Sequence, residues 1–168
     1  EESKVSADQS ALAWIKNNKK ENPVNKNQIA EAFVWKASLY LSNTGVTGFL
    51  LPGKTLFKTQ ENAIEFRKRF FNRMDVWCIV NFANLRRLLF KRATNPAVAF
   101  FYRAWQKNLE KPGSILTYAP FAMNQISQYD LSKRGRKKLW TVLVNADEMR
   151  EIPYRDILSG TFKEQSFK

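Results

Sequence analysis

Between residues 27 and 103, short continuous apolar runs alternate with stretches in which apolar residues recur at helical spacing. This pattern predicts strands joined by helices. Three short apolar runs, at residues 46–51, 76–80 and 97–102, lie between turn residues, as buried strands do. Between the first two runs, apolar residues recur every three or four positions up to residue 72, starting from residue 59 or 62. The pattern therefore predicts a strand, a helix and two further strands.

A longer helix is predicted ahead of the first strand. Asn27 can cap its start, and Gly45 can end the turn that follows it, because glycine accepts a positive φ. The helical spacing gives one apolar face, expected to pack on the core: Ile29, Phe33, Ala37, Tyr40 and Leu41.

The third strand is expected to run antiparallel to the other two. The pattern of residues 80–97 lacks a full crossover helix, which a parallel connection needs. They hold instead a short basic stretch with Leu85, Leu88 and Leu89 turned inward. We therefore predict an α/β fold with a mixed sheet.

The flanking segments are more polar. Residues 1–26 form a polar lead-in with one short helix, and residues 27–103 form the α/β unit. Residues 104–168 form a linker and a small extension, with extended stretches at 115–121 and 139–144. Residues 146–158 are expected to be one helix or, because of Pro153, two short pieces.

Charge and composition narrow the choice of partner. The 168 residues hold 28 Lys and Arg against 15 Asp and Glu, a net charge of +13, which favours a polyanion such as nucleic acid. The alternative is a basic surface without a partner. No apolar run is long enough to cross a bilayer. The single Cys78 indicates a core residue in a cytoplasmic protein, and the lack of histidine excludes His-based catalysis and zinc binding.

Three stretches follow one another in a distinctive order: AEAFVWKASLYL–SNTG–VTGFLLPGKTLF, FRKRFF…WCIVNF and LRRLLF–KRATNPAVAFFY. In this order they resemble the N6-adenine DNA methyltransferases of restriction–modification systems, above all the type IIG enzymes that fuse nuclease, methyltransferase and target-recognition parts. The resemblance covers about residues 24–103 and extends weakly to residue 160. It implies a partial mixed sheet, the second half of a class I S-adenosylmethionine-dependent methyltransferase fold. It also implies that the small α+β extension in residues 104–168 is the start of a DNA- or target-recognition part.

The resemblance also implies site residues. Phe33 matches a phenylalanine beside the adenine of the cofactor, and Pro52 matches the end of the strand near the active site. Phe90, or Phe82 as a second choice, matches the aromatic that packs on a flipped-out adenine. Composition alone makes Phe33 and Phe90 core residues and Phe82 the end of a strand, so both interpretations stay open.

Two motifs of that family are missing from the sequence: a Gly-bearing S-adenosylmethionine loop and an Asn/Asp-Pro-Pro-aromatic catalytic loop. Asn22-Pro23 and Asn95-Pro96 lack the second proline and the aromatic. We therefore expect a piece of a larger enzyme that binds the cofactor only in the intact parent and does not transfer methyl groups alone. An exposed sheet edge would then meet the rest of the parent polypeptide, or a second copy.

Basic residues are the candidate DNA contacts, with a solvated surface as the alternative. The candidates are Lys54, Arg86, Arg87, Lys91, Arg92, Lys133, Arg134, Arg136, Lys137 and Lys138. Two rival functions remain: a stand-alone nucleic-acid- or partner-binding module, and a metal-dependent nuclease. The nuclease is disfavoured, because Glu61, Asp75, Asp147 and Glu148 are expected to be caps and surface charges.

Overall fold

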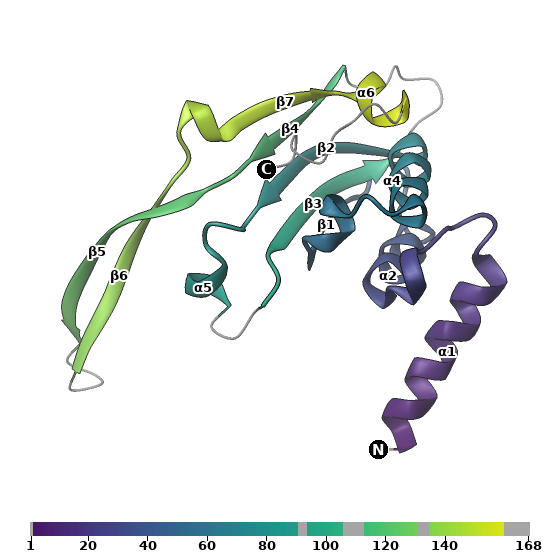
Figure 1. The fold of residues 1–168 in the computed structure, drawn as a ribbon, viewed down its shortest axis with the longest axis horizontal. Coiled ribbons are helices and arrows are strands. Elements are labelled where there is room, and N and C mark those ends of the chain that lie inside the picture. Colours follow the sequence, from purple (N-terminus) through teal and green to yellow (C-terminus); the bar gives the residue numbers. More distant parts are fainter. Residues whose placement is uncertain (1, 91–93, 106–112, 131–134, 160–168) are drawn as a thin grey trace.

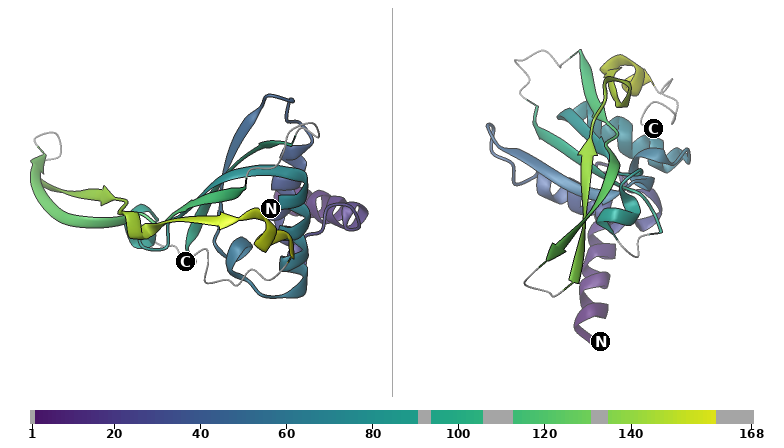
Figure 2. Two further views of the ribbon diagram at one scale, coloured as in Figure 1. Left: turned by 90° about the horizontal axis from the view of Figure 1, so that it is seen from above. Right: turned by 90° about the vertical axis from the view of Figure 1, so that its left-hand side faces the viewer.

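A computed structural model describes residues 2–90, 94–105, 113–130 and 135–159. Figure 1 shows three parts: a twisted sheet with helices packed against it, a long two-stranded ribbon, and an N-terminal helix that extends away from the sheet. The left view of Figure 2 shows the ribbon and this helix at opposite ends of the molecule.

Five strands form the sheet, in the order β1–β3–β2–β4–β7. Their bounds are β1 (Val46–Pro52), β2 (Met74–Asn81), β3 (Ala97–Ala104), β4 (Ser114–Tyr118) and β7 (Met149–Pro153). β3 runs antiparallel to both β1 and β2, β4 is parallel to β2, and β7 is antiparallel to β4. The predicted mixed sheet and the predicted antiparallel third strand are both confirmed.

The helices and helical turns are mostly short. They are α1 (Glu2–Asn18), η1 (Asn25–Asn27), α2 (Ile29–Ser38), α3 (Lys54–Phe57), α4 (Glu61–Arg73), α5 (Arg86–Leu89), η2 (Ala146–Glu148) and α6 (Tyr154–Ser159). Every helix among the described residues is too short or too polar to span a bilayer.

The core is rich in aromatic side chains. Phe70 of α4 lies at its centre, with ring centroids 5.2 Å from Trp35 of α2 and 5.0 Å from Tyr102 of β3. The next residue of α4, Phe71, packs against Phe100 of β3 and Tyr154 of α6. Edge-to-face packing of this kind stabilises a core beyond the area it buries, and here it fixes three helices on one face of the sheet.

The predicted apolar face of α2 is wrong. Phe33 is 59% exposed and Tyr40 79% exposed, whereas Val34 and Trp35 are buried. Trp35 decides the rotation of the helix, because its large ring packs against α4 and its Nε1 donates a 2.9 Å hydrogen bond to the Pro23 carbonyl. The helix also ends at Ser38, before Tyr40 could extend the face.

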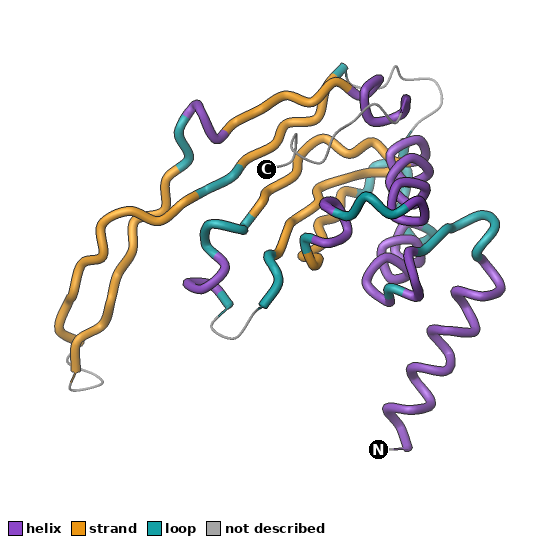
Figure 3. The backbone as a smooth tube through the Cα atoms, in the orientation of Figure 1, coloured by secondary structure: helices purple, strands orange, loops and turns teal. Residues whose placement is uncertain are grey.

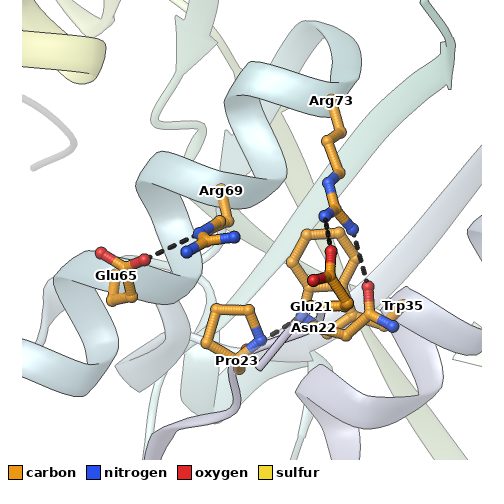
Figure 4. A network of polar contacts seen from close by, with 7 residues as sticks. All are labelled: Glu21, Asn22, Pro23, Trp35, Glu65, Arg69 and Arg73. Carbon is orange, nitrogen blue, oxygen red and sulfur yellow. Dashed lines mark hydrogen bonds and ion pairs between the residues drawn. The ribbon is translucent and has the colours of Figure 1, made fainter. Parts of the chain in front are cut away.

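The loop before η1 is tied to the end of α4. Arg73 donates hydrogen bonds to Oδ1 of Asn22 at 3.0 Å and to Oε2 of Glu21 at 2.9 Å (Figure 4). Its guanidinium also lies 5.6 Å from the ring centre of Trp35, within range of a cation–π interaction. These contacts anchor α2 on α4 from outside the core.

Residues 146–158 do not form one helix. They divide at Pro153, as the two-piece alternative proposed, but the first piece is η2 followed by strand β7. Residues 149–153 become a strand because β4 offers them an unpaired edge, in the register Tyr118↔Met149 to Ser114↔Pro153. The sheet thereby continues past residue 103, where the sequence places the end of the α/β unit.

A two-stranded ribbon completes the fold. β5 (Phe121–Asp130) and β6 (Gly135–Leu143) pair antiparallel, with a bulge between Met123 and Ile126. β5 continues from β4, and β6 leads back through η2 to β7, so the ribbon is the far end of a hairpin rooted in the sheet (Figure 3). The predicted strand at 139–144 lies largely within β6, but the pattern gave no sign of β5.

Candidate nucleic-acid interface

An open hollow of about 400 Å³ lies where β1 ends and β3 begins. Its lining combines apolar, aromatic and polar side chains: Leu50, Leu51, Pro52, Lys54, Phe90, Thr94, Asn95, Pro96 and Ala97. β2 runs parallel to β1 on the other side of β3, so the carboxyl ends of both strands reach this edge. Ligands of open α/β sheets bind at such an edge.

Backbone hydrogen bonds hold the hollow together. The N–H of Gly53 donates to the carbonyl of Pro96 at 2.7 Å, and the N–H of Phe82 donates to the carbonyl of Ala97 at 2.9 Å. Residues 96–97 are thereby fixed between the ends of β1 and β2. This wall of the hollow is built before any ligand arrives.

Gly53 is required by close packing. A Cβ at this position would lie 2.7 Å from Cε2 of Phe57 and 3.0 Å from Cγ of Pro96. Only glycine lets α3 begin so near the loop. The position of Lys54, the first residue of α3, depends on this approach.

The short helix α5 leads directly to Phe90, another residue of the lining. Leu85, which precedes α5, is buried, and Arg86 donates a 2.8 Å hydrogen bond to the carbonyl of Thr94. This bond joins α5 to the loop before β3. Phe90, directly after the helix, is half-buried and lines the hollow.

The charge of the hollow is positive. Lys54 lies in its lining, and no lining residue is acidic. Because Arg86 bonds the loop next to the hollow, a second cation lies close by. Arg87 is exposed on α5. A phosphate group near the hollow would meet cations and no carboxylate of the lining.

Three of the residues chosen from the sequence meet in this hollow: Pro52, Lys54 and Phe90. Phe82 is half-buried and reaches the same strand end through its backbone bond to Ala97. Phe33 does not join them. It lines a separate apolar hollow of about 260 Å³ between α1 and α2, together with Trp14 and Ile29.

The remaining basic candidates lie elsewhere. Arg136, Lys137 and Lys138 lie on β6, opposite Tyr129, Gln128 and Ser127 of β5. Lys91, Arg92, Lys133 and Arg134 lie outside the described residues.

Sequence reasoning passed over Thr94, Asn95 and Pro96 as lining residues. An Asn-Pro pair ahead of a predicted strand is a turn signal, and it marks the loop that closes the hollow. The sequence interpretation set Asn95-Pro96 aside because it lacks a second proline and an aromatic residue. Its place in the fold shows a different use, since Pro96 contacts the turn at Gly53.

Asn25 and Glu31 form a buried polar cluster. Glu31 is 1% exposed, and its Oε2 accepts a 2.7 Å hydrogen bond from the N–H of Asn25. Burial raises the pKa of Glu31 to about 7, against the lowering effects of that hydrogen bond and of Arg67, Lys58 and Lys54. Lys54 thus influences this cluster while it lines the hollow, so the two features share one residue.

Arg67 of α4 is buried although it is charged. It donates hydrogen bonds to the carbonyls of Lys58 at 2.7 Å and Thr55 at 3.4 Å. These carbonyls end α3 and begin the loop that leads to α4, and the guanidinium has donors for both. Asp75 is also buried, not a surface charge, and it accepts a 2.7 Å hydrogen bond from Nε of Arg103.

The described residues do not make a complete S-adenosylmethionine site. The hollow has no carboxylate, and the space at Gly53 and Gly48 is filled by the side chains of Phe57, Pro96 and Phe101 and not left open as a cradle. The described part of the chain likewise holds no group of three or more Cys, Asp or Glu side chains placed to bind a metal ion. The hollow offers one apolar and aromatic wall for a planar group.

The chain matches no protein-family model, and no curated protein is similar to it in sequence. One similar solved structure is the methyltransferase subunit of a type I restriction-modification system from Streptococcus thermophilus, with a TM-score of 0.57 and 11% sequence identity. The likeness covers 92% of this chain and 33% of that subunit, so the chain spans about a third of its length. The fold of this chain is therefore a mixed α/β fold similar to part of a restriction-modification methyltransferase subunit.

Proposed function

We propose that this chain is part of an adenine-N6 DNA methyltransferase of a restriction–modification system, related to the type IIG enzymes. One observation supports it most: Pro52, Lys54 and Phe90 meet in one hollow at the carboxyl end of β1. A fold similar to that of a restriction-modification methyltransferase subunit adds to it.

The hollow has the chemistry that an unstacked adenine needs. A base taken out of a duplex loses its stacking and pairing partners, and an enzyme replaces them with an aromatic face and hydrogen bonds. Phe90 supplies the aromatic face, and the amide of Asn95 can donate and accept hydrogen bonds. Lys54 would hold a phosphate beside the base.

In this proposal the rest of the parent polypeptide completes the enzyme. S-adenosylmethionine supplies the methyl group when it is bound by the intact parent, and this chain alone transfers none. Strand β1 has a neighbour on one side only among the described strands, so its other edge is where further strands of the parent, or a second copy, would pair. Such an enzyme would meet its DNA in the cytoplasm.

Binding to two labelled duplexes tests the proposal. They are identical except that one adenine lies opposite an abasic site in the second duplex, where unstacking costs less. The chain should bind the second duplex more tightly, and Phe90→Ala should remove this preference. Phe33→Ala is the matched control, because Phe33 is an exposed aromatic outside the hollow. Equal binding of both duplexes by the unaltered chain would refute the proposal.

A second candidate function is a stand-alone basic nucleic-acid-binding or partner-binding module. The ribbon favours it, because β5 and β6 extend beyond the sheet and carry part of the basic run. A module of this kind should bind duplex DNA without regard to the unpaired adenine. The same two duplexes therefore separate the two functions.

A further inference from the structure

The β5–β6 ribbon stands apart from the rest of the fold. Each strand pairs with the other, and neither makes more than marginal contact with any other described helix or strand. Figure 2 shows it reaching well beyond the sheet. A two-stranded hairpin without support is marginally stable in water, so a ribbon of this length indicates that something else contacts it.

The root of the ribbon exposes apolar side chains. Trp140 is 42% exposed and Val142 49% exposed, on alternate positions of one strand face. The other side chains in this exposed set are Met123, Leu139, Leu143 and Val144. Apolar groups gathered on a surface mark an interaction site.

The far end of the ribbon is basic. Residues 121–144 contain five Lys and Arg side chains, all between residues 133 and 138, and one acidic residue, Asp130. Arg136, Lys137 and Lys138 lie on β6, paired with residues 127–129 of β5, on the side of the ribbon away from the sheet's end at Leu143. The ribbon therefore combines an apolar root with a strongly cationic end, and its charge complements a polyanion.

We propose that the β5–β6 ribbon is an arm that enters the major groove of duplex DNA. The choice of DNA as the partner rests on the proposed function. The assignment of the ribbon as a DNA-contacting arm goes beyond that function. The major groove of B-form DNA is about 12 Å wide and admits a two-stranded β-ribbon. The major groove of A-form RNA is too narrow and deep for side chains to read. The basic end contacts phosphates, and the apolar root contacts thymine methyl groups.

Binding of a fluorescent DNA duplex by the full chain, at several salt concentrations, tests the arm. The variant Arg136→Gln/Lys137→Gln/Lys138→Gln removes three charges from the ribbon. The control Lys16→Gln/Lys19→Gln/Lys20→Gln removes three exposed charges near the end of α1. Each lost phosphate contact lowers the slope of log affinity against log salt by about 0.9. The ribbon variant should thus bind at least about tenfold more weakly with a flatter slope, and the control should change less than about threefold.

Groove occupancy is tested separately with Trp140→Ala and with modified nucleic acid. DNA whose pyrimidines carry bulky 5-substituents, which fill the major groove, should bind more weakly to the unaltered chain. An RNA duplex of the same length should bind as this modified DNA does. Trp140→Ala should reduce the difference between plain and modified DNA. Circular dichroism of each variant checks that the sheet is intact.

The proposed arm is contradicted if the ribbon variant binds DNA as tightly as its control does. It is also contradicted if the unaltered chain binds plain DNA and DNA with a filled major groove equally. Preference for the unpaired adenine is a separate readout, because it depends on Phe90. If the ribbon variant binds normally and the preference persists, only the arm fails. If the ribbon variant binds weakly and no preference exists, only the base-binding hollow fails.

Discussion

The N–H of Asn25 donates a 2.7 Å hydrogen bond to Oε2 of Glu31, a carboxyl group that is almost fully buried. The bond closes a turn in which Lys26 and Asn27 have φ angles of 44° and 57°, a conformation that side-chain-bearing residues seldom adopt. Glu31 thus ties an unusual turn to the start of α2.

Glu31 should make stability depend on pH. Its pKa in the folded protein is raised to about 7 from 4.5, so folding favours the protonated form. The stability this gives is complete below pH 4.5 and is lost as the pH rises through 7. Glu31→Gln mimics the neutral form and does not titrate. As the pH rises between these values, the free energy of unfolding of the unaltered chain should therefore fall relative to that of Glu31→Gln, by up to about 3 kcal/mol.

Urea unfolding across this pH range measures the difference. Glu65→Gln serves as the control, because Glu65 is partly exposed and pairs with Arg69 on the surface of α4 (Figure 4). A constant difference between Glu31→Gln and the unaltered chain would show that Glu31 does not titrate as its burial requires.

Arg67→Met should destabilise the fold by about 2–3 kcal/mol, because it leaves the buried carbonyl of Thr55 and the partly buried carbonyl of Lys58 without this donor. Arg69→Met, on the same helix, breaks only an exposed ion pair and should cost less than about 0.5 kcal/mol. Thermal or urea unfolding of the two variants compares a buried and a surface arginine directly. Equal effects would contradict the structural role of Arg67.

Gly53→Ala should cost about 1–3 kcal/mol, because the new methyl group must displace Phe57 or Pro96. Gly113→Ala is the control, since nothing lies within 4 Å of a Cβ at that position. Gly53→Ala should also weaken the preference for an unpaired adenine, because it shifts the wall of the hollow. A variant that is destabilised but keeps the full preference would separate the packing of Gly53 from the binding site.

Tyr154→Phe should release α6 from the sheet. The Tyr154 hydroxyl accepts a 2.6 Å hydrogen bond from the N–H of Val76. It also donates a 3.0 Å hydrogen bond to the carbonyl of Val76 in β2. Loss of these buried bonds should cost about 1–3 kcal/mol. Hydrogen exchange should show faster exchange at the Val76 amide, and unchanged protection there would contradict the contact.

Strong local patterns in the sequence predicted the central strands, and these are correct. Each apolar run between turn residues became β1, β2 or β3. The lack of a crossover helix between residues 80 and 97 correctly implied an antiparallel strand. The rotation of α2 could not be predicted in this way, because the spacing of apolar residues does not decide whether Phe33 or Trp35 faces the core. Tertiary contacts decided it, since the Trp35 ring found Phe70 and the Pro23 carbonyl.

Features that depend on hydrogen bonds to the backbone were hardest to predict. Arg67 appears charged and helical in sequence, and only the carbonyls beside it explain its burial. β5 contains few apolar residues in regular alternation, so the sequence pattern did not reveal it as a strand. It becomes a strand because it pairs with β6 in the hairpin. Pro52 and Phe90 were chosen by resemblance and Lys54 for its charge, and the fold brings the three together in one hollow.

Photocrosslinking to a DNA duplex tests the central claim most directly. The duplex carries 8-azidoadenine opposite an abasic site, and mass spectrometry maps the linked peptide in the full chain. The adduct should fall within residues 50–54 or 90–97, and Phe90→Ala should reduce its yield. An adduct on α1, on the exposed face of α2 at Phe33 or on the ribbon alone would contradict a base-binding hollow at the end of β1.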